Sequence, residues 1–76
     1  MRSITYDTDH ETIVVSFNGP LTTVEIYDDA GIRACGHAKQ HPDDNFSDEF
    51  GKALALSRAS HRYFRKIEKR LVRSTK

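Results

Sequence analysis

The hydrophobic period of this 76-residue chain changes once, close to residue 41, and this change restricts the folds that the chain can adopt. Before it, apolar residues fall on alternate positions, which is the period of strands with one buried face. After it, they recur every three or four residues, which is the period of an amphipathic helix. Because so short a chain supports only one hydrophobic core, we expect a single domain over residues 1–76.

The alternating segments predict three to four short strands, over residues 2–7, 12–17, 22–28 and 31–39. Residues that tolerate turn dihedrals separate them, as at 18–20 and 28–31. Because each connection is short, consecutive strands should pair as an antiparallel meander. The last strand places Ala34, Gly36 and Ala38 on its apolar face, and such small residues let a helix approach the sheet closely.

The second period predicts one long helix, from about residue 46 to 73. At 100° per residue it carries an apolar stripe, which we assign to the sheet and which consists of Phe46, Phe50, Ala53, Leu54, Ser57, Ser60, Phe64, Ile67 and Leu71. Phe50, Leu54 and Phe64 should be its buried anchors. A helix of this length measures about 40 Å, whereas a short strand spans about 17 to 20 Å, so the last two turns should extend beyond the sheet. The expected fold is α+β, an antiparallel meander packed by one C-terminal helix.

Charge is segregated along the chain, although the net charge is only +1. Residues 1–49 hold three basic and ten acidic side chains, whereas residues 50–76 hold nine basic side chains and Glu68 alone. Such asymmetry is typical of proteins that have a charged partner. Basic residues gather on the helix opposite the predicted stripe: Arg58, Arg62, Arg65, Lys66, Lys69, Arg70 and Arg73.

This basic face predicts nucleic-acid binding, because Arg and Lys pair with phosphate oxygens along a backbone. A merely solvated face is the alternative, although such faces ordinarily mix Glu with Lys, and this one has almost no acids. A second hypothesis is an inhibitor of a host protein such as a defence nuclease, of the anti-CRISPR or anti-restriction type. The acids that would compete for a basic groove are Asp7, Asp9, Glu11, Glu25, Asp28 and Asp29. A third is a self-assembling structural protein.

A motif spans the junction between the predicted sheet and helix. HPDDNF at residues 41–46 is followed by GKALALSRA at residues 51–59. The pattern His-Pro-Asp-Asp-x-Phe, then Gly-x-x-Leu-Ala-Leu-x-Arg-Ala, resembles that of small phage-encoded proteins of unknown function with a double-stranded-RNA-binding-domain-like fold. The resemblance covers about residues 23–64 and implies the sheet and final helix of that fold, without its first helix. Because the predicted helix opens with acidic residues, which repel phosphates, double-stranded RNA recognition by the usual surface is not expected.

Catalytic and metal-binding roles are not predicted. The spacing of Cys35, His37 and His41 suits a metal, but zinc sites usually need a second ligand pair. Cys35 and His37 should lie side by side on one strand face, yet no third orienting group can be named, so we expect neither an enzyme nor a cofactor. Tyr and Arg are favoured at protein interfaces, and the residues that could form one are Tyr27, Arg33, His37, Tyr63 and Leu71.

The lone Cys35 permits no intramolecular disulfide, which favours a reducing cytoplasm, that of the host if the chain is phage-encoded. The N-terminal residues lack an apolar signal segment, and no 18 apolar residues run together, so neither secretion nor membrane insertion is expected. A single helix cannot cover four strands, and its far end carries Tyr63, Phe64, Ile67, Leu71 and Val72. We therefore expect a homodimer that covers these ends, unless the end frays or folds onto its own first strand.

Overall fold

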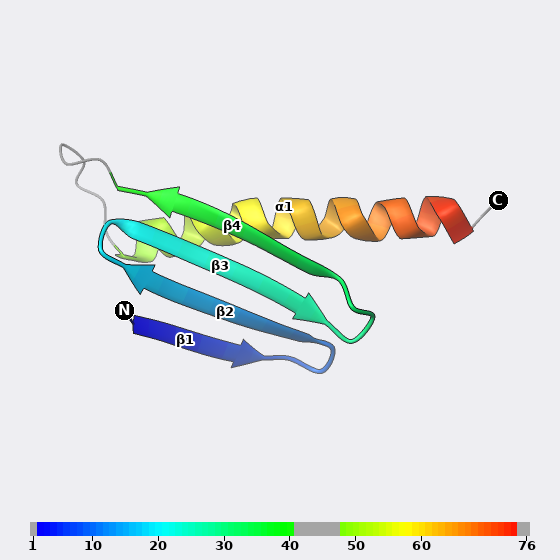
Figure 1. The fold of residues 1–76 in the computed structure, drawn as a ribbon, viewed down its shortest axis with the longest axis horizontal. Coiled ribbons are helices and arrows are strands. Elements are labelled where there is room, and N and C mark those ends of the chain that lie inside the picture. The colour runs from blue at the N-terminus through cyan, green and yellow to red at the C-terminus, as the bar shows by residue number, and fades with distance from the viewer. Residues whose placement is uncertain (1, 41–47, 75–76) are drawn as a thin grey trace.

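The computed structural model describes residues 2–40 and 48–74. Within them the chain forms four strands and one helix, namely β1 (Arg2–Asp7), β2 (Glu11–Asn18), β3 (Leu21–Asp28), β4 (Arg33–Lys39) and α1 (Asp48–Ser74) (Figure 1). The strands pair in the order β1-β2-β3-β4, each antiparallel to its neighbour, which confirms the predicted α+β meander and helix. The motif segment 41–46, including the stripe residue Phe46, lies outside the described residues.

Short turns join the strands, and glycine takes the positive φ where a turn needs it, with 59° at Gly19 and 84° at Gly31. Asp28 organises the β3–β4 turn, because its Oδ1 accepts a hydrogen bond of 2.8 Å from the Ile32 N–H. The β1–β2 and β3–β4 turns lie at the same end of the sheet, where the Asp29 N–H donates to the His10 carbonyl at 3.1 Å.

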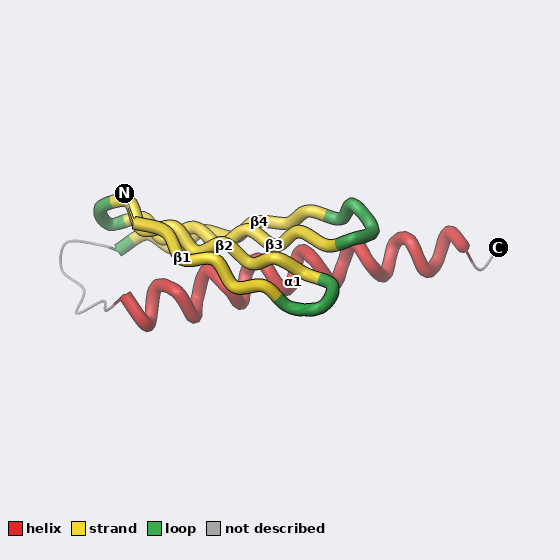
Figure 2. The backbone as a smooth tube through the Cα atoms, turned by 90° about the horizontal axis from the view of Figure 1, so that it is seen from below, coloured by secondary structure: helices red, strands yellow, loops and turns green. Residues whose placement is uncertain are grey.

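The molecule has two layers, one sheet and one helix, and measures 50 × 22 × 14 Å (Figure 2). Helix α1 crosses the strands obliquely and packs on β3 and β4, and its C-terminal end extends beyond the sheet as predicted (Figure 1). Strand β1 lies outside this packing, apart from a hydrogen bond of 3.2 Å that Lys52 donates to the Tyr6 hydroxyl, and all six of its residues are exposed. Among the described residues, no helix has the length and apolar character needed to cross a membrane.

The core lies where α1 meets β4, and the two backbones are very close there. A Cβ atom on Gly36 would lie 2.4 Å from the Ala59 backbone N and 2.5 Å from the Ala55 carbonyl oxygen. The predicted close approach over the small residues of β4 is therefore confirmed. The buried core residues are Val15, Val24, Ile26, Ile32, Ala34, Ala38, Ala55, Ala59 and Tyr63.

The predicted phase of the helix is wrong. Phe50 and Phe64, which were expected to be buried anchors, are 57% and 64% exposed, and only Leu54 packs against the core. The residues that face the sheet are instead Ala55, Ala59 and Tyr63, four positions apart. The reason is steric, because a contact this close admits Ala between the two backbones and excludes a phenylalanine ring.

Candidate functional site

Four cations of α1, spaced four residues apart, bind backbone carbonyls beside the edge of the sheet. Each donates one hydrogen bond, and we call these four residues the edge row. The pairs are Arg58 with the His37 carbonyl at 2.6 Å, Arg62 with Cys35 at 2.9 Å, Lys66 with Arg33, and Arg70 with Ala30 at 2.7 Å.

The edge row forms because the spacing of residues along α1 matches that along β4. Strand β4 is an edge strand, so its outward carbonyls have no neighbouring strand to bond. Four helical residues advance about 6 Å, and two strand residues advance nearly the same distance, so Arg58, Arg62 and Lys66 meet alternate carbonyls of β4. Arg70 meets the Ala30 carbonyl in the turn before β4. These residues were expected on the side of the helix opposite the sheet, and that placement is wrong for Arg58, Arg62, Lys66 and Arg70.

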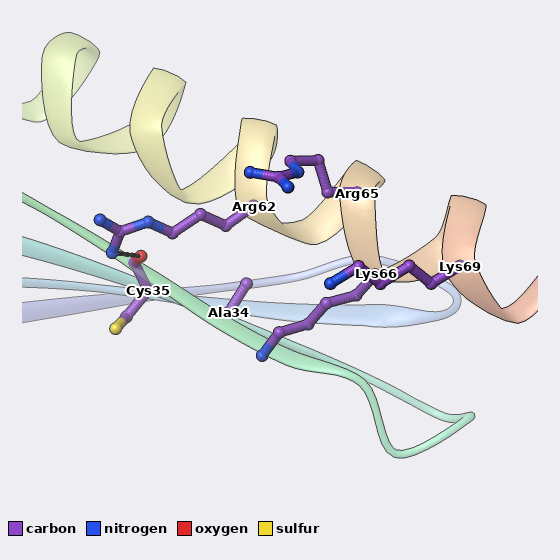
Figure 3. Close-up of a pocket in the computed structure, with 6 residues that line it drawn as sticks. All are labelled: Ala34, Cys35, Arg62, Arg65, Lys66 and Lys69. Atoms are coloured by element: carbon purple, nitrogen blue, oxygen red, sulfur yellow. Dashed lines mark hydrogen bonds between the residues drawn. The ribbon is translucent and has the colours of Figure 1, made fainter.

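Two adjoining hollows lie between β4 and the C-terminal half of α1. The first, about 330 Å³, is lined by Ala34, Cys35, Arg62, Arg65, Lys66 and Lys69 (Figure 3). The second, about 350 Å³, is lined by Gly31, Ile32, Arg33, Lys66, Lys69, Arg70 and Arg73. Lys66 and Lys69 line both, so the hollows form one surface, which we call the basic groove.

The basic groove brings together six of the seven predicted binding residues, all except Arg58. Every charged residue described in its lining is Arg or Lys. Arg33 also lines the groove from β4, but its guanidinium is bound by Glu25 on the other face of the sheet, where the sequence assigned it to a protein interface.

On the other face of the sheet, Glu25, Tyr27 and Arg33 form a small network. Arg33 donates to Glu25 at 3.1 Å with its guanidinium 5.2 Å from the centre of the Tyr27 ring, and the Tyr27 hydroxyl also donates to Glu25. The hydrogen bond from Tyr27 and the charge of Arg33 hold the pKa of Glu25 below its usual value. The same bond to a carboxylate raises the pKa of Tyr27. Tyr27 and Arg33 thus lie together on the uncovered face, where an interface was hypothesised.

His37 lies on that same face between two side chains. Its Nδ1 is 3.1 Å from Thr23 Oγ1, and its Nε2 is 3.9 Å from Cys35 Sγ. Thr23 is the neighbour of His37 that the sequence did not identify. His37 is exposed and the other two side chains are half-buried, so the three form a hydrogen-bonded surface cluster.

Tyr63 is buried rather than available to a partner, which corrects its assignment to an interface. It is 7% exposed, and its hydroxyl donates to Asp28 Oδ2 at 2.8 Å. Burial and this hydrogen bond to an anion raise the pKa of Tyr63 to about 12. Leu71, in contrast, is 60% exposed on the overhanging end.

Within residues 2–40 and 48–74, no three His, Cys, Asp or Glu side chains are grouped so that they could hold a metal ion. Comparisons with protein-family models, with curated proteins and with solved structures found no match to this chain. The site is therefore interpreted from its own geometry.

Proposed function

We propose that this chain is a non-catalytic accessory protein, of the phage-encoded type that its motif resembles, and that it binds the phosphate backbone of nucleic acid in the basic groove. The observation that carries the proposal is the lining of two adjoining hollows, in which each charged residue described is a cation. A concave surface of one sign concentrates the potential and attracts a polyanion.

The dimensions of the groove suit a backbone. From Arg62 to Arg73 the helix rises about 16 Å, which is the axial length of about five nucleotides of one strand. Cations from three successive turns of α1 line this length. Several phosphates are therefore within reach at once.

The edge row supports this proposal because it fixes three of the cations in place. Arg62, Lys66 and Arg70 each donate one hydrogen bond to a carbonyl. A guanidinium has five N–H donors and an ammonium has three, so donors remain for phosphate oxygens. Side chains that are already ordered lose less conformational entropy on binding.

The lining also indicates how selective such binding is. Aromatic side chains are the main platforms on which bases stack, and none of the described residues lining the groove is aromatic. We therefore expect the protein to contact phosphates without reading base sequence, on duplexes and single strands alike.

Fluorescence anisotropy with labelled duplex DNA, duplex RNA and single strands tests this function. Wild-type protein should bind all of them at about 50 mM salt, and the logarithm of affinity should fall linearly with the logarithm of salt concentration. Lys69, which lines both hollows, is the position to change. Lys69→Glu should weaken binding by about tenfold or more and lower the salt slope by at least about one.

Lys39→Glu is the matched control, because it makes the same charge change at an exposed residue outside the groove. It should bind almost as wild type does. Absence of binding by wild-type protein at low salt, or equal losses in the two variants, would contradict the proposal.

The acidic end of the sheet favours a second function, inhibition of a host protein that itself binds nucleic acid. The two turns at this end hold Asp7, Asp9, Glu11, Asp28 and Asp29, and the contact between Asp29 and His10 joins them. Such a surface could occupy a basic groove of a partner. If labelled nucleic acid does not bind, purified host nucleases inhibited by wild type and not by Asp9→Lys would support this function instead.

A further inference from the structure

Most of the apolar stripe expected to face the sheet is turned away from it, although Leu54 and Ile67 pack against the core. Phe50, Phe64 and Leu71 are 57%, 64% and 60% exposed, and Ala53 and Ser57 are exposed as well. Ser60 and Ile67 are half-buried. We call these seven residues the outer stripe. Large apolar side chains that are exposed along one side of a helix are typical of interaction surfaces.

The spacing of the outer stripe identifies the kind of partner. Phe50, Ser57, Phe64 and Leu71 are seven residues apart, and Ala53, Ser60 and Ile67 form a second set seven apart. These are the a and d positions of a heptad repeat over about three heptads, which is the pattern of helices that pack on one another at a small angle. The partner surface is therefore another helix.

We propose that the outer stripe packs antiparallel on the outer stripe of a second copy of this chain. With the two-fold axis near residue 62, each a position lies opposite a d position of the partner. The resulting layers each place a small residue against a large one. They pair Ala53 with Leu71 of the partner, Ser57 with Ile67, and Ser60 with Phe64. Alternating sizes let the layers interdigitate, and the two-fold axis repeats each layer.

Charge selects the antiparallel direction. Residues 62–73 carry six cations against Glu68, whereas Asp48 and Glu49 balance Lys52 and Arg58 over residues 48–60. A parallel pair would place the two cationic ends side by side. The antiparallel pair places each cationic end beside a neutral segment, and like charges are kept apart.

The pair is compatible with the rest of the fold. The sheet lies on the side of α1 that carries Ala55 and Ala59, and Ile67 alone in the outer stripe also packs against the core, so the two sheets become the outer layers of the pair. Arg62, Arg65, Lys66, Lys69 and Arg73 occupy heptad positions outside the a and d seam. The inference therefore does not depend on the proposed function, and association is measured without nucleic acid.

Sedimentation equilibrium from micromolar to submillimolar concentration tests the proposal. The wild-type mass should rise from 8.7 kDa to twice that value. Phe64→Glu should keep the monomer mass and keep its helical circular dichroism, since Phe64 is exposed in the single chain. Val72→Glu changes an equally exposed apolar residue outside the outer stripe and should still associate. A wild type that stays at 8.7 kDa, or a Phe64→Glu variant that still associates, would overturn the proposal.

Cross-linking in a Cys35→Ser background tests the direction. In the antiparallel pair the two copies of residue 61 lie next to each other at the two-fold axis, so His61→Cys should form a disulfide-linked dimer on oxidation. The two copies of residue 53 should lie about 27 Å apart, so Ala53→Cys should stay monomeric on a non-reducing gel. Cross-linking of Ala53→Cys without His61→Cys would show a parallel pair and overturn the arrangement.

Discussion

Gly36 determines how closely the helix and the sheet approach. A methyl group there would meet backbone atoms of Ala55 and Ala59, which cannot move aside as a flexible side chain can. Gly36→Ala should therefore lift α1 from β4 and lower the free energy of unfolding by about 1 to 3 kcal/mol. Urea denaturation followed by circular dichroism measures the loss.

Cys35→Ala is the control for this prediction, because it changes the neighbouring residue on the opposite face of β4. It should unfold at nearly the wild-type urea concentration. Equal midpoints for Gly36→Ala and wild type would show that the two backbones do not rest on each other.

Asp28 and Tyr63 join the β3–β4 turn to the helix, and this contact depends on pH. Burial raises the pKa of Asp28, but the hydrogen bonds from Tyr63 and from the Ile32 and Ala30 N–H groups, with Arg70 nearby, outweigh it. The pKa of Asp28 is therefore lowered in the folded protein. The stabilisation that Asp28 provides is present above its unfolded pKa of about 3.9 and is lost as the pH falls through the folded pKa. Thermal melting between about pH 5 and pH 2 should show a smaller acid loss in Tyr63→Phe than in wild type.

Tyr63→Phe should also alter the loss of stability at alkaline pH. The pKa of Tyr63 is raised from its usual 10.0 to about 12, so its contribution is full below pH 10.0 and is lost as pH rises towards about 12. Tyr63→Phe should remove that part of the alkaline loss. Tyr6→Phe removes a different hydroxyl, which accepts a hydrogen bond from Lys52 at 3.2 Å, and should leave the acid loss as it is in wild type. Identical pH profiles for all three proteins would contradict the assignment.

At the scale of the elements, the edge row fastens α1 to β4. Arg62→Met with Lys66→Met keeps the length of the side chains and removes two charged donors to the Cys35 and Arg33 carbonyls. Because exposed hydrogen bonds contribute modestly, we expect a loss of about 1 kcal/mol in the free energy of unfolding. The double variant Arg65→Met with Lys69→Met removes the same charge and should unfold as wild type does. A loss of similar size in both would mean that net charge, and not the carbonyl bonds, determines stability.

The sequence predicted the meander because each strand and turn is a local pattern. The β2–β3 pairing follows from Gly19, and the alternating residues assign each side chain to a face. The phase of the helix could not be predicted from hydrophobicity, since Phe50 and Phe64 outweigh Ala55 and Ala59 in any apolar count. What chooses the face is fit against Gly36, and that depends on two segments distant in sequence.

The helix phase also limited what could be predicted of the site. The set of cations was visible from composition, but which of them bind carbonyls and which line the basic groove follows from the helix phase and its oblique path over β4. A signal was present nevertheless. Gly51, Ala55 and Ala59 form a row of small residues at four-residue spacing, and they match the small residues predicted on β4.

Across the whole molecule, α1 packs on some strands and not on others, and we expect local stability to differ in the same way. Helix α1 packs on β3 and β4, whereas β1 is exposed along its length and is bonded on one side to β2. Native-state amide exchange should therefore be fastest in β1 among the strands and slowest in β3, which has a strand on each side and the helix across one face. Protection in β1 equal to that in β3 would show that the sheet opens only as a unit, or that another chain covers β1.

The position of the helix at the end of the described chain has a consequence for synthesis. The ribosome releases the strands first, and the residues that bury Val24, Ile26 and Ala34 lie between Ala55 and Tyr63. An isolated meander with one unburied apolar face is only marginally stable in water. The nascent chain should therefore stay unfolded until the helix as far as Tyr63 has left the exit tunnel and can pack on the sheet.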